Sequence, residues 1–151
     1  MTSKKSIDSF LSKKNIAVIG VSSKGKGFGT AVFSHLKKNG FNVFGVNKNG
    51  GIYENENLYE SLTLIPEKID AVITVVPPVE TEKVVTEANE LGIKDIWMQQ
   101  GSESKAAIDY CNENGMNIIA GECILMFAEP VKSIHSFHRW INRIIGKYPT
   151  N

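Results

Sequence analysis

Residues 15–29 read NIAVIGVSSKGKGFG, and this stretch decides the fold. Its first part, NIAVIG (15–20), is a continuous apolar run of the kind that a strand buried on both faces of a sheet requires. A glycine-rich loop follows, and residues 30–39 then carry Val32, Phe33 and Leu36 at helical spacing before Gly40. A buried strand, a glycine-rich turn and a helix together indicate the start of a βαβ unit.

Further apolar runs alternate with helical patterns along the rest of the chain. We predict strands at 42–46, 69–76, 95–98 and 117–120, helices at 79–91 and 103–114, and a short helix at 59–64. Strands that alternate with such helices form parallel sheets with right-handed crossovers. The prediction is an α/β fold, a Rossmann-like three-layer α/β/α sandwich whose five-stranded parallel sheet has the order 3-2-1-4-5.

After the fifth predicted strand, residues 133–145 form an amphipathic pattern. Ile134, Phe137, Ile141 and Ile144 recur there at helical spacing. This C-terminal helix either docks on the domain or pairs with a partner chain. We therefore expect a single domain, 1–151, with a C-terminal helical extension at 130–151, because 151 residues suit one hydrophobic core.

Composition excludes several classes of protein. No apolar run approaches the length of a membrane span, and the first ten residues lack the apolar stretch of a signal peptide. The two cysteines have no CxxC spacing, which suits a reducing compartment and supplies no zinc site. We expect a cytoplasmic protein that has no membrane partner.

The net charge of +1 hides an uneven distribution. Residues 9–53 contain seven lysines and no acidic residue, whereas residues 54–151 carry 8 basic and 15 acidic residues, and residues 1–8 carry +1. The balance is therefore +7 in one block and −6 in the rest of the chain. A basic block attracts anions, and this one is too short and glycine-rich for a nucleic-acid domain. We expect a nucleotide ligand and no nucleic acid.

The loop after the first strand has the residues of a phosphate site. Backbone N–H groups of such a loop and the following helix N-terminus bind anions. The loop departs from the GxGxxG pattern at Ser22, and from a Walker A loop at Gly27, which replaces the hydroxyl that holds magnesium. We expect a phosphate cradle without NTP hydrolysis, and the alternative is a glycine-rich turn without a ligand. Its candidate residues are Gly20, Ser22, Ser23, Lys24, Lys26 and Gly27.

The ends of the other strands limit the choice of nucleotide. A typical NAD site has an acidic residue after the second strand, but this chain has Val46, Asn47 and Lys48. A lysine at this position favours a ligand with a phosphorylated ribose. The remaining candidate ligands are therefore NADP and coenzyme A. Two further groups lie at the same predicted edge, a rigid apolar ledge after the third strand and an amide with a glycine after the fourth: Val76, Pro77, Pro78, Gln100 and Gly101. The prolines serve equally well as a simple strand terminator.

Four stretches together resemble one family. They are IAVIGVSSKGKGFGTAVFSHLKKNGFNVFGVN, VVPP, WMQQG and the cysteine at 123, and within 14–129 they resemble the CoA-binding domain family. That family shares its fold with the N-terminal domain of the succinyl-CoA synthetase α subunit. The chain departs from the family pattern at Lys48, where proline is common, and at Ile124.

The resemblance implies a role for each matching position. Gly20, Ser22, Ser23 and Lys26 would surround the CoA phosphates, residues 46–48 would meet the adenosine, residues 76–78 would flank the nucleotide, and Gln100 and Gly101 would lie near the arm. The synthetase's phosphohistidine belongs to a further domain, so the resemblance also implies that this chain is not a complete acyl-CoA ligase.

Other side chains offer weaker chemistry. Cys123 could form a mixed disulfide with a ligand thiol, although a free cysteine is more often a small buried hydrophobe. His135 and His138 share a helix face but lack a third metal ligand, and Cys111 has no evident base. We predict no catalytic residue and no metal site.

The leading hypothesis is a small stand-alone CoA-binding protein. It would bind coenzyme A or an acyl-CoA as a carrier, sensor or regulatory module without catalysis of its own. The alternative is an NAD(P)-binding oxidoreductase or redox sensor. A third hypothesis is an interaction module that forms a homodimer through its C-terminal helix.

Overall fold

The computed structural model describes residues 2–128. The extension predicted at 130–151 and its helix, with His135 and His138, lie outside the described residues. The elements in chain order are α1 (Lys4–Leu11), β1 (Asn15–Ile19), α2 (Phe28–Lys38), β2 (Asn42–Val46), β3 (Ile52–Tyr53), β4 (Glu56–Tyr59), η1 (Leu62–Leu64), β5 (Ala71–Thr74), α3 (Pro78–Glu90), β6 (Asp95–Gln99), α4 (Lys105–Glu113), β7 (Asn117–Glu122) and η2 (Ile124–Met126). None of the helices within residues 2–128 is both long enough and apolar enough to span a bilayer.

The α/β class is confirmed, but the predicted strand order is wrong. The sheet of residues 2–128 has the order β3-β4-β2-β1-β5-β6-β7, so the five predicted strands follow one another as 2-1-3-4-5 instead of 3-2-1-4-5. The third predicted strand, β5, pairs with β1 through Ile16↔Ala71, and the place beside β2 belongs to β4. The sequence predicts only a short helix at 59–64, whereas β4 ends at the first residue of that range and the helix η1 covers its second half.

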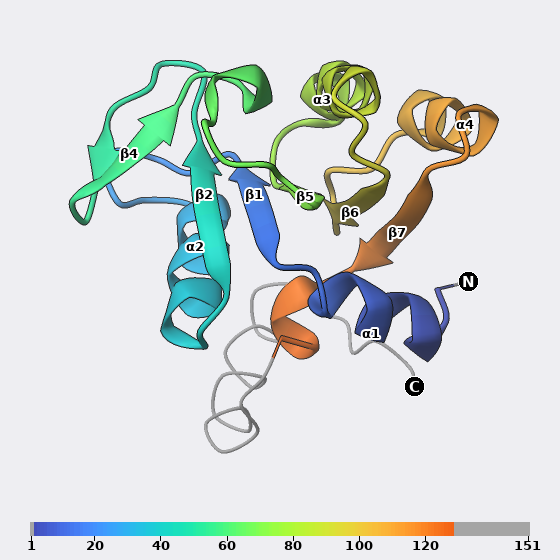
Figure 1. Cartoon of the computed structure of the whole chain (residues 1–151), viewed down its shortest axis with the longest axis horizontal. Helices are drawn as coiled ribbons and strands as arrows, with labels where there is room; N and C mark the ends of the chain where they lie inside the picture. The colour runs from blue at the N-terminus through green and yellow to red at the C-terminus, as the bar shows by residue number, and fades with distance from the viewer. Residues whose placement is uncertain (1, 129–151) are drawn as a thin grey trace.

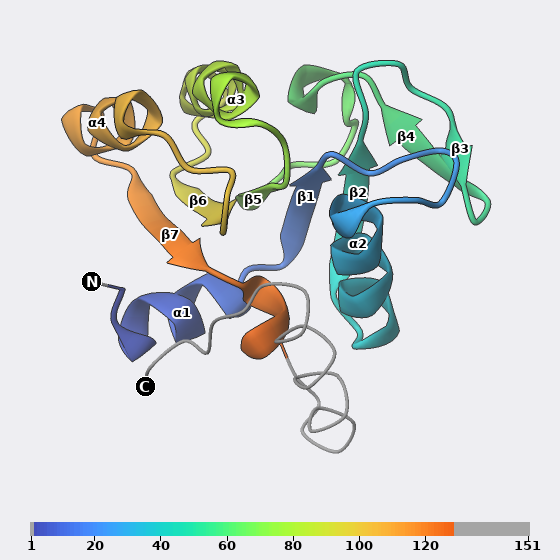
Figure 2. The same cartoon turned by 180° about the vertical axis from the view of Figure 1, so that it is seen from behind.

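The sheet lies between two layers of helices (Figure 1, Figure 2). Helices α3 and α4 cover one face, and α1, α2 and η2 cover the other. Side chains alternate between the two faces, as a strand requires. Val18 and Trp97 pack toward α1 and α2, whereas Ala17 and Met98 pack toward α3 and α4. The core therefore holds β1 firmly between β2 and β5, and the site is built where these three strands end.

Helix α1 was not predicted. The Ser3 hydroxyl caps its first turn by accepting a hydrogen bond from the Ser6 N–H at 3.1 Å. Ile7 and Phe10 are buried, and the Phe10 ring meets the Trp97 ring edge-on at 5.3 Å. The serine cap followed by two apolar residues three positions apart was the available signal.

Candidate functional site

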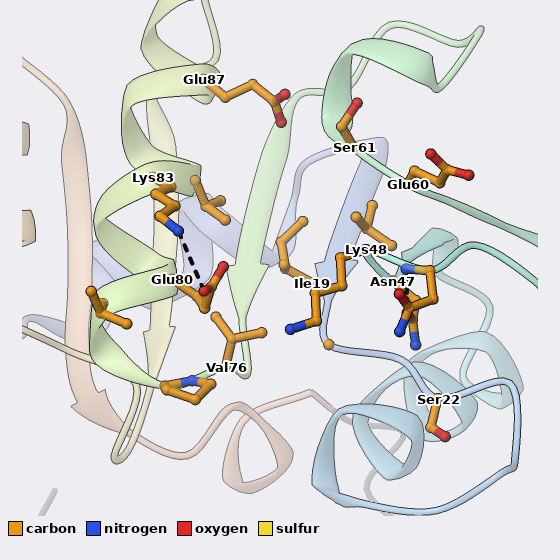
Figure 3. Close-up of a pocket in the computed structure, with 16 residues that line it drawn as sticks. Ile19, Ser22, Asn47, Lys48, Glu60, Ser61, Val76, Glu80, Lys83 and Glu87 are labelled. Atoms are coloured by element: carbon orange, nitrogen blue, oxygen red, sulfur yellow. Dashed lines mark hydrogen bonds and ion pairs between the residues drawn. The ribbon is translucent and has the colours of Figure 1, made fainter.

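A cavity of about 470 Å³ lies at the carboxyl ends of β1, β2 and β5, beside α3. This is the point where the strand order reverses direction from β1, the usual ligand position in open α/β sheets. Figure 3 shows its walls, with α3 on one side and the residues after β2 and β4 on the other. The cavity is lined by Ile19, Gly20, Ser22, Val46, Asn47, Lys48, Asn49, Glu60, Ser61, Val76, Pro77, Val79, Glu80, Lys83, Val84 and Glu87.

Gly20 allows the chain to turn sharply out of β1 at the floor of the cavity. Its φ is +108°, and a Cβ atom there would lie 2.3 Å from the carbonyl oxygen of Val75. The Gly20 N–H donates to the carbonyl oxygen of Val46 at 2.9 Å, which ties the end of β1 to the end of β2. Only glycine fits a backbone so placed.

The Thr30 hydroxyl fixes the glycine-rich loop from inside the first turn of α2. It accepts a hydrogen bond from the Ser22 N–H at 2.9 Å and donates one to the carbonyl oxygen of Lys26 at 2.9 Å. The Ser22 hydroxyl in turn accepts a bond from the Lys24 N–H at 3.1 Å. Because Thr30 is buried, it holds both ends of the loop in a defined position.

The hairpin of β3 and β4 closes the outer side of this loop. Its turn, Glu54 and Asn55, has positive φ at both residues, as a type I′ turn requires. A Cβ atom on Gly25 would come within 3.2 Å of the Tyr53 ring, and one on Gly51 would come within 2.9 Å of Ser23 Cβ. The loop is therefore packed between α2 and the hairpin.

Asn47 uses its side chain to hold the fold together. Its Nδ2 donates to the carbonyl oxygen of Val21 at 2.8 Å, and its Oδ1 accepts from the Asn49 N–H at 2.8 Å. The sequence offered Asn47 as a partner for ribose or adenine. The structure shows why an acidic residue is absent from this position, since a carboxylate would face the Val21 carbonyl oxygen without a proton to donate.

Three buried hydroxyls fasten the α3 wall of the cavity to the turn after β6. Ser102 Oγ donates to Thr74 Oγ1 at 2.9 Å and lies 2.7 Å from Thr81 Oγ1. It also accepts from the Val76 N–H at 3.4 Å. The prolines that follow begin α3, with Pro78 at its first position, where a missing N–H costs nothing.

Five charged residues line the cavity, three of them on α3. Lys48 extends from the end of β2 toward α3, where Glu80 and Lys83 form an ion pair at 3.6 Å (Figure 3). Glu87 accepts hydrogen bonds from the Leu62 N–H at 2.9 Å and the Thr63 hydroxyl at 3.2 Å, so its carboxylate caps η1. The fifth charged residue of the lining is Glu60.

The cavity brings together half of the predicted binding residues. Gly20, Ser22, Val46, Asn47, Lys48, Val76 and Pro77 line it. Its lining within residues 2–128 does not include the other seven, and their role stays a prediction: Ser23, Lys24, Lys26, Gly27, Pro78, Gln100 and Gly101. In the turn that holds Gln100 and Gly101, the Gly101 N–H donates a hydrogen bond to the Glu103 carboxylate at 2.8 Å.

Sequence reasoning missed the contribution of α3. Val79, Glu80, Lys83, Val84 and Glu87 line the cavity, and so do Ile19, Asn49, Glu60 and Ser61. A signal was available, because Glu80, Lys83 and Glu87 recur at helical spacing and must share one face of the predicted helix. The spacing of these residues does not tell whether their shared face is turned toward the strand ends.

Neither cysteine has the surroundings of a reactive thiolate. Both are buried, and burial raises the pKa of Cys111 to about 11. Burial also raises the pKa of Cys123, against the opposing effect of the Gln99 amide and of backbone donors in η2. Thiolate attack requires the deprotonated form, so these shifts disfavour the mixed disulfide considered for Cys123.

A family model described as a CoA binding domain matches residues 14–129. The chain belongs to the CoA binding domain family. This confirms the family resemblance drawn from the glycine-rich loop and the strand ends. Membership supports coenzyme A as the ligand of the domain and gives no support to NAD(P).

Relatives of this CoA binding domain include two ligase subunits from Pyrococcus furiosus. The α subunit of ADP-forming acetate–CoA ligase II is 30% identical over 129 residues, which are 78% of this chain and 28% of the subunit. The α subunit of ligase I is 26% identical over 143 residues, covering 84% of this chain and 31% of that subunit. The chain thus spans less than a third of the length of these relatives.

Solved structures of similar size share the fold of the domain. A hypothetical protein from Pyrococcus horikoshii superposes with a TM-score of 0.77 at 26% identity, covering 93% of both chains. A conserved hypothetical protein from Pyrococcus furiosus gives a TM-score of 0.69 at 32% identity, covering 74% of this chain and 96% of its own. The Rossmann-like α/β architecture is therefore shared by proteins of about this length.

Proposed function

We propose that this chain binds coenzyme A or an acyl-CoA in the cavity beside α3, as a carrier, sensor or regulatory module without catalysis of its own. The observation that carries the proposal is the position of Lys48, which extends into a cavity at the switch point of a CoA binding domain. The ligand's diphosphate would lie beside the turn at Gly20 and Ser22, where the N-terminus of α2 favours anions.

The remaining parts of the ligand would lie against the walls described above. The adenosine would lie between Lys48 and the apolar ledge of Val76 and Pro77, with its 3′-phosphate at the Lys48 ammonium. The arm would pass Val79, whose side chain is 58% exposed at the cavity rim and would gain contacts from it. The ligand is a small nucleotide, and the proposal includes neither nucleic acid nor membrane.

The relationship to ligase α subunits supports the CoA-binding part of the proposal. The aligned segment is less than a third of those subunits, so we propose only their nucleotide recognition for this chain. The homodimer through residues 133–145 stays a prediction, which size-exclusion chromatography of the full chain at several concentrations tests.

Titration calorimetry and thermal denaturation with coenzyme A, acetyl-CoA, NAD and NADP test the binding proposal. A ligand at 100 times its Kd stabilises the native state by about 2.7 kcal/mol, which raises the Tm of a domain this size by several degrees. We expect this shift with coenzyme A or acetyl-CoA. A shift with NAD or NADP and none with either CoA species would overturn the proposal.

A further inference from the structure

We propose that Lys83 is a second cation for the ligand's 3′-phosphate, and that Glu80 occupies Lys83 until that phosphate arrives. This inference rests on the proposed function, since it names a residue that would make the same site specific. Sequence reasoning assigned the phosphate to Lys48 alone. The structure adds a lysine on the opposite wall of the same cavity, one helical turn after an acidic residue.

Lys48 and Lys83 face the same space from opposite walls. Figure 3 shows the Lys48 side chain reaching across the cavity from the end of β2 toward α3, where the Lys83 ammonium is paired with Glu80. Both ammonium groups belong to residues that line the cavity. A phosphate monoester held by two ammonium groups makes charge-assisted hydrogen bonds to each, because it has three acceptor oxygens and nearly two negative charges.

The Glu80–Lys83 ion pair is weak enough to be exchanged. Its atoms are 3.6 Å apart, and the side chains of Lys83 and Glu80 are 73% and 38% exposed. Exposed pairs of this i,i+3 kind contribute little to stability, because water screens the charges and both side chains lose freedom. A dianion between two lysines attracts Lys83 more strongly than a single half-exposed carboxylate does.

The other two carboxylates of the cavity leave this position open to an anion. In Figure 3 Glu87 lies at the top of the view and Glu60 at its right side, away from Glu80, Lys83 and the Lys48 ammonium. Glu87 is already bound to the Leu62 N–H and the Thr63 hydroxyl. The part of the cavity around Lys48, Lys83 and Glu80 therefore carries two cations and one anion, and its net charge of +1 attracts an anion.

Glu80 would also limit which anions can bind to Lys83. A nucleotide without the 3′-phosphate leaves the Glu80–Lys83 pair intact and gains nothing from Lys83. A nucleotide with the phosphate releases Lys83 and gains a charged contact. Specificity of this kind comes from a difference in affinity between two ligands, and here Lys83 supplies that difference. Glu80 reduces the gain of any anion that must displace it, so only a strongly charged group such as a phosphate dianion benefits from Lys83.

Calorimetry with coenzyme A and 3′-dephospho-CoA on the full chain tests this role. We expect Lys83→Ala to weaken coenzyme A about tenfold, the size of one charge-assisted hydrogen bond, and to change dephospho-CoA by less than about twofold. Lys83→Arg should keep most of the preference for coenzyme A. The matched control is Lys105→Ala, which removes the lysine of a similar exposed pair, with Asp109, on α4 outside the cavity lining. It should change neither Kd.

Glu80→Gln should change the affinity for coenzyme A in the opposite direction to Lys83→Ala. It removes the competitor and one negative charge, so coenzyme A should bind several-fold more tightly. The gain should be smaller in the K83A background, where only the removal of the charge remains. A K83A protein that loses both ligands equally, or that keeps the wild-type preference for coenzyme A, overturns the role of Lys83. If the wild type binds both ligands equally, CoA binding stands and the inference fails. If the wild type binds neither ligand, the proposed function fails as well.

Discussion

A Cβ atom on Gly29 would lie 2.1 Å from the carbonyl oxygen of Gly20. The first turn of α2 therefore rests directly on the backbone at the end of β1, with no side chain between them. This contact brings the N-terminus of α2 to the glycine-rich loop, and the buried Thr30 hydroxyl then fixes the loop. The phosphate position of the proposed site depends on this approach of helix to strand.

Gly29→Ala should destabilise the domain, although alanine is the better helix former. In an open helix position this substitution would stabilise by about 0.8–1 kcal/mol. Here the added methyl group meets the backbone of Gly20, and overpacking of this kind costs about 1–3 kcal/mol. Urea denaturation measures the sign, and Ala31→Gly in the same helix serves as the control for propensity. A more stable G29A protein would show that α2 does not rest on β1 in this way.

Asn47→Asp should weaken the fold without creating an NAD site. The substitution places a carboxylate oxygen 2.8 Å from the Val21 carbonyl oxygen, where an N–H now donates. Loss of this bond and the new repulsion should cost about 1–3 kcal/mol of unfolding free energy. Asn49→Asp adds the same charge to an exposed neighbour and is the control. Denaturation and calorimetry with NAD are the measurements, and NAD binding by N47D at unchanged stability would contradict the structural role of Asn47.

Lys48→Ala should weaken coenzyme A more than 3′-dephospho-CoA. A charged hydrogen bond to the 3′-phosphate contributes about 1.5–3 kcal/mol, and dephospho-CoA cannot make it. The Kd ratio of the two ligands is the measurement. Lys24→Ala removes an equal charge from the loop beside the cavity and should leave this ratio nearly unchanged. Equal losses of both ligands in K48A would mean that Lys48 does not recognise the 3′-phosphate.

Stability should fall at alkaline pH because of Cys111. Its pKa in the folded domain is about 11, against an ordinary value of 9.0, so the unfolded chain loses the thiol proton first. Fewer protons are then bound in the unfolded state, and the unfolding free energy decreases with rising pH between about 9 and 11. The loss should be of the order of 2 kcal/mol.

Cys111→Ala isolates this contribution from other titrating groups. The variant should start from a lower stability, because it loses a buried side chain. Its unfolding free energy should nevertheless decline less steeply than that of the wild type across the same pH range. Urea denaturation at pH 8, 9.5 and 10.5 provides the comparison, and parallel declines would show that Cys111 titrates normally.

The sequence predicted those elements whose pattern is local. Strands such as β1 and β5 are uninterrupted apolar runs, because both of their faces are buried. Strand β4, with the sequence ENLY, buries only Leu58 and pairs with β2 through Gly45↔Leu58 and Val46↔Tyr59. Its polar residues carry no strand pattern, and its place beside β2 is set by pairing across the sheet. Missing this one strand produced the wrong strand order.

For the candidate site, the sequence predicted the residues at the strand ends but not those on α3. Residues at the carboxyl ends of parallel strands gather at one edge, which is why Gly20, Lys48 and Val76 were found together. Glu80 and Lys83 reach the cavity only because α3 packs on the sheet with that face turned to the strand ends. The orientation of α3 depends on the contacts between helix and sheet, and the helical spacing of the residues alone does not predict it.

The packing of the β3–β4 hairpin against the glycine-rich loop has a kinetic consequence. The hairpin is at the edge of the sheet, and its two strands pair with each other through Ile52↔Asn57 and Tyr53↔Glu56. Short edge elements open at a lower free energy than a central strand such as β1. The segment that encloses the loop is thus among the first to exchange its amide hydrogens with solvent. A nucleotide on the loop would slow that exchange at Tyr53, far along the chain from the phosphates, so hydrogen exchange in the hairpin reports whether the site is filled.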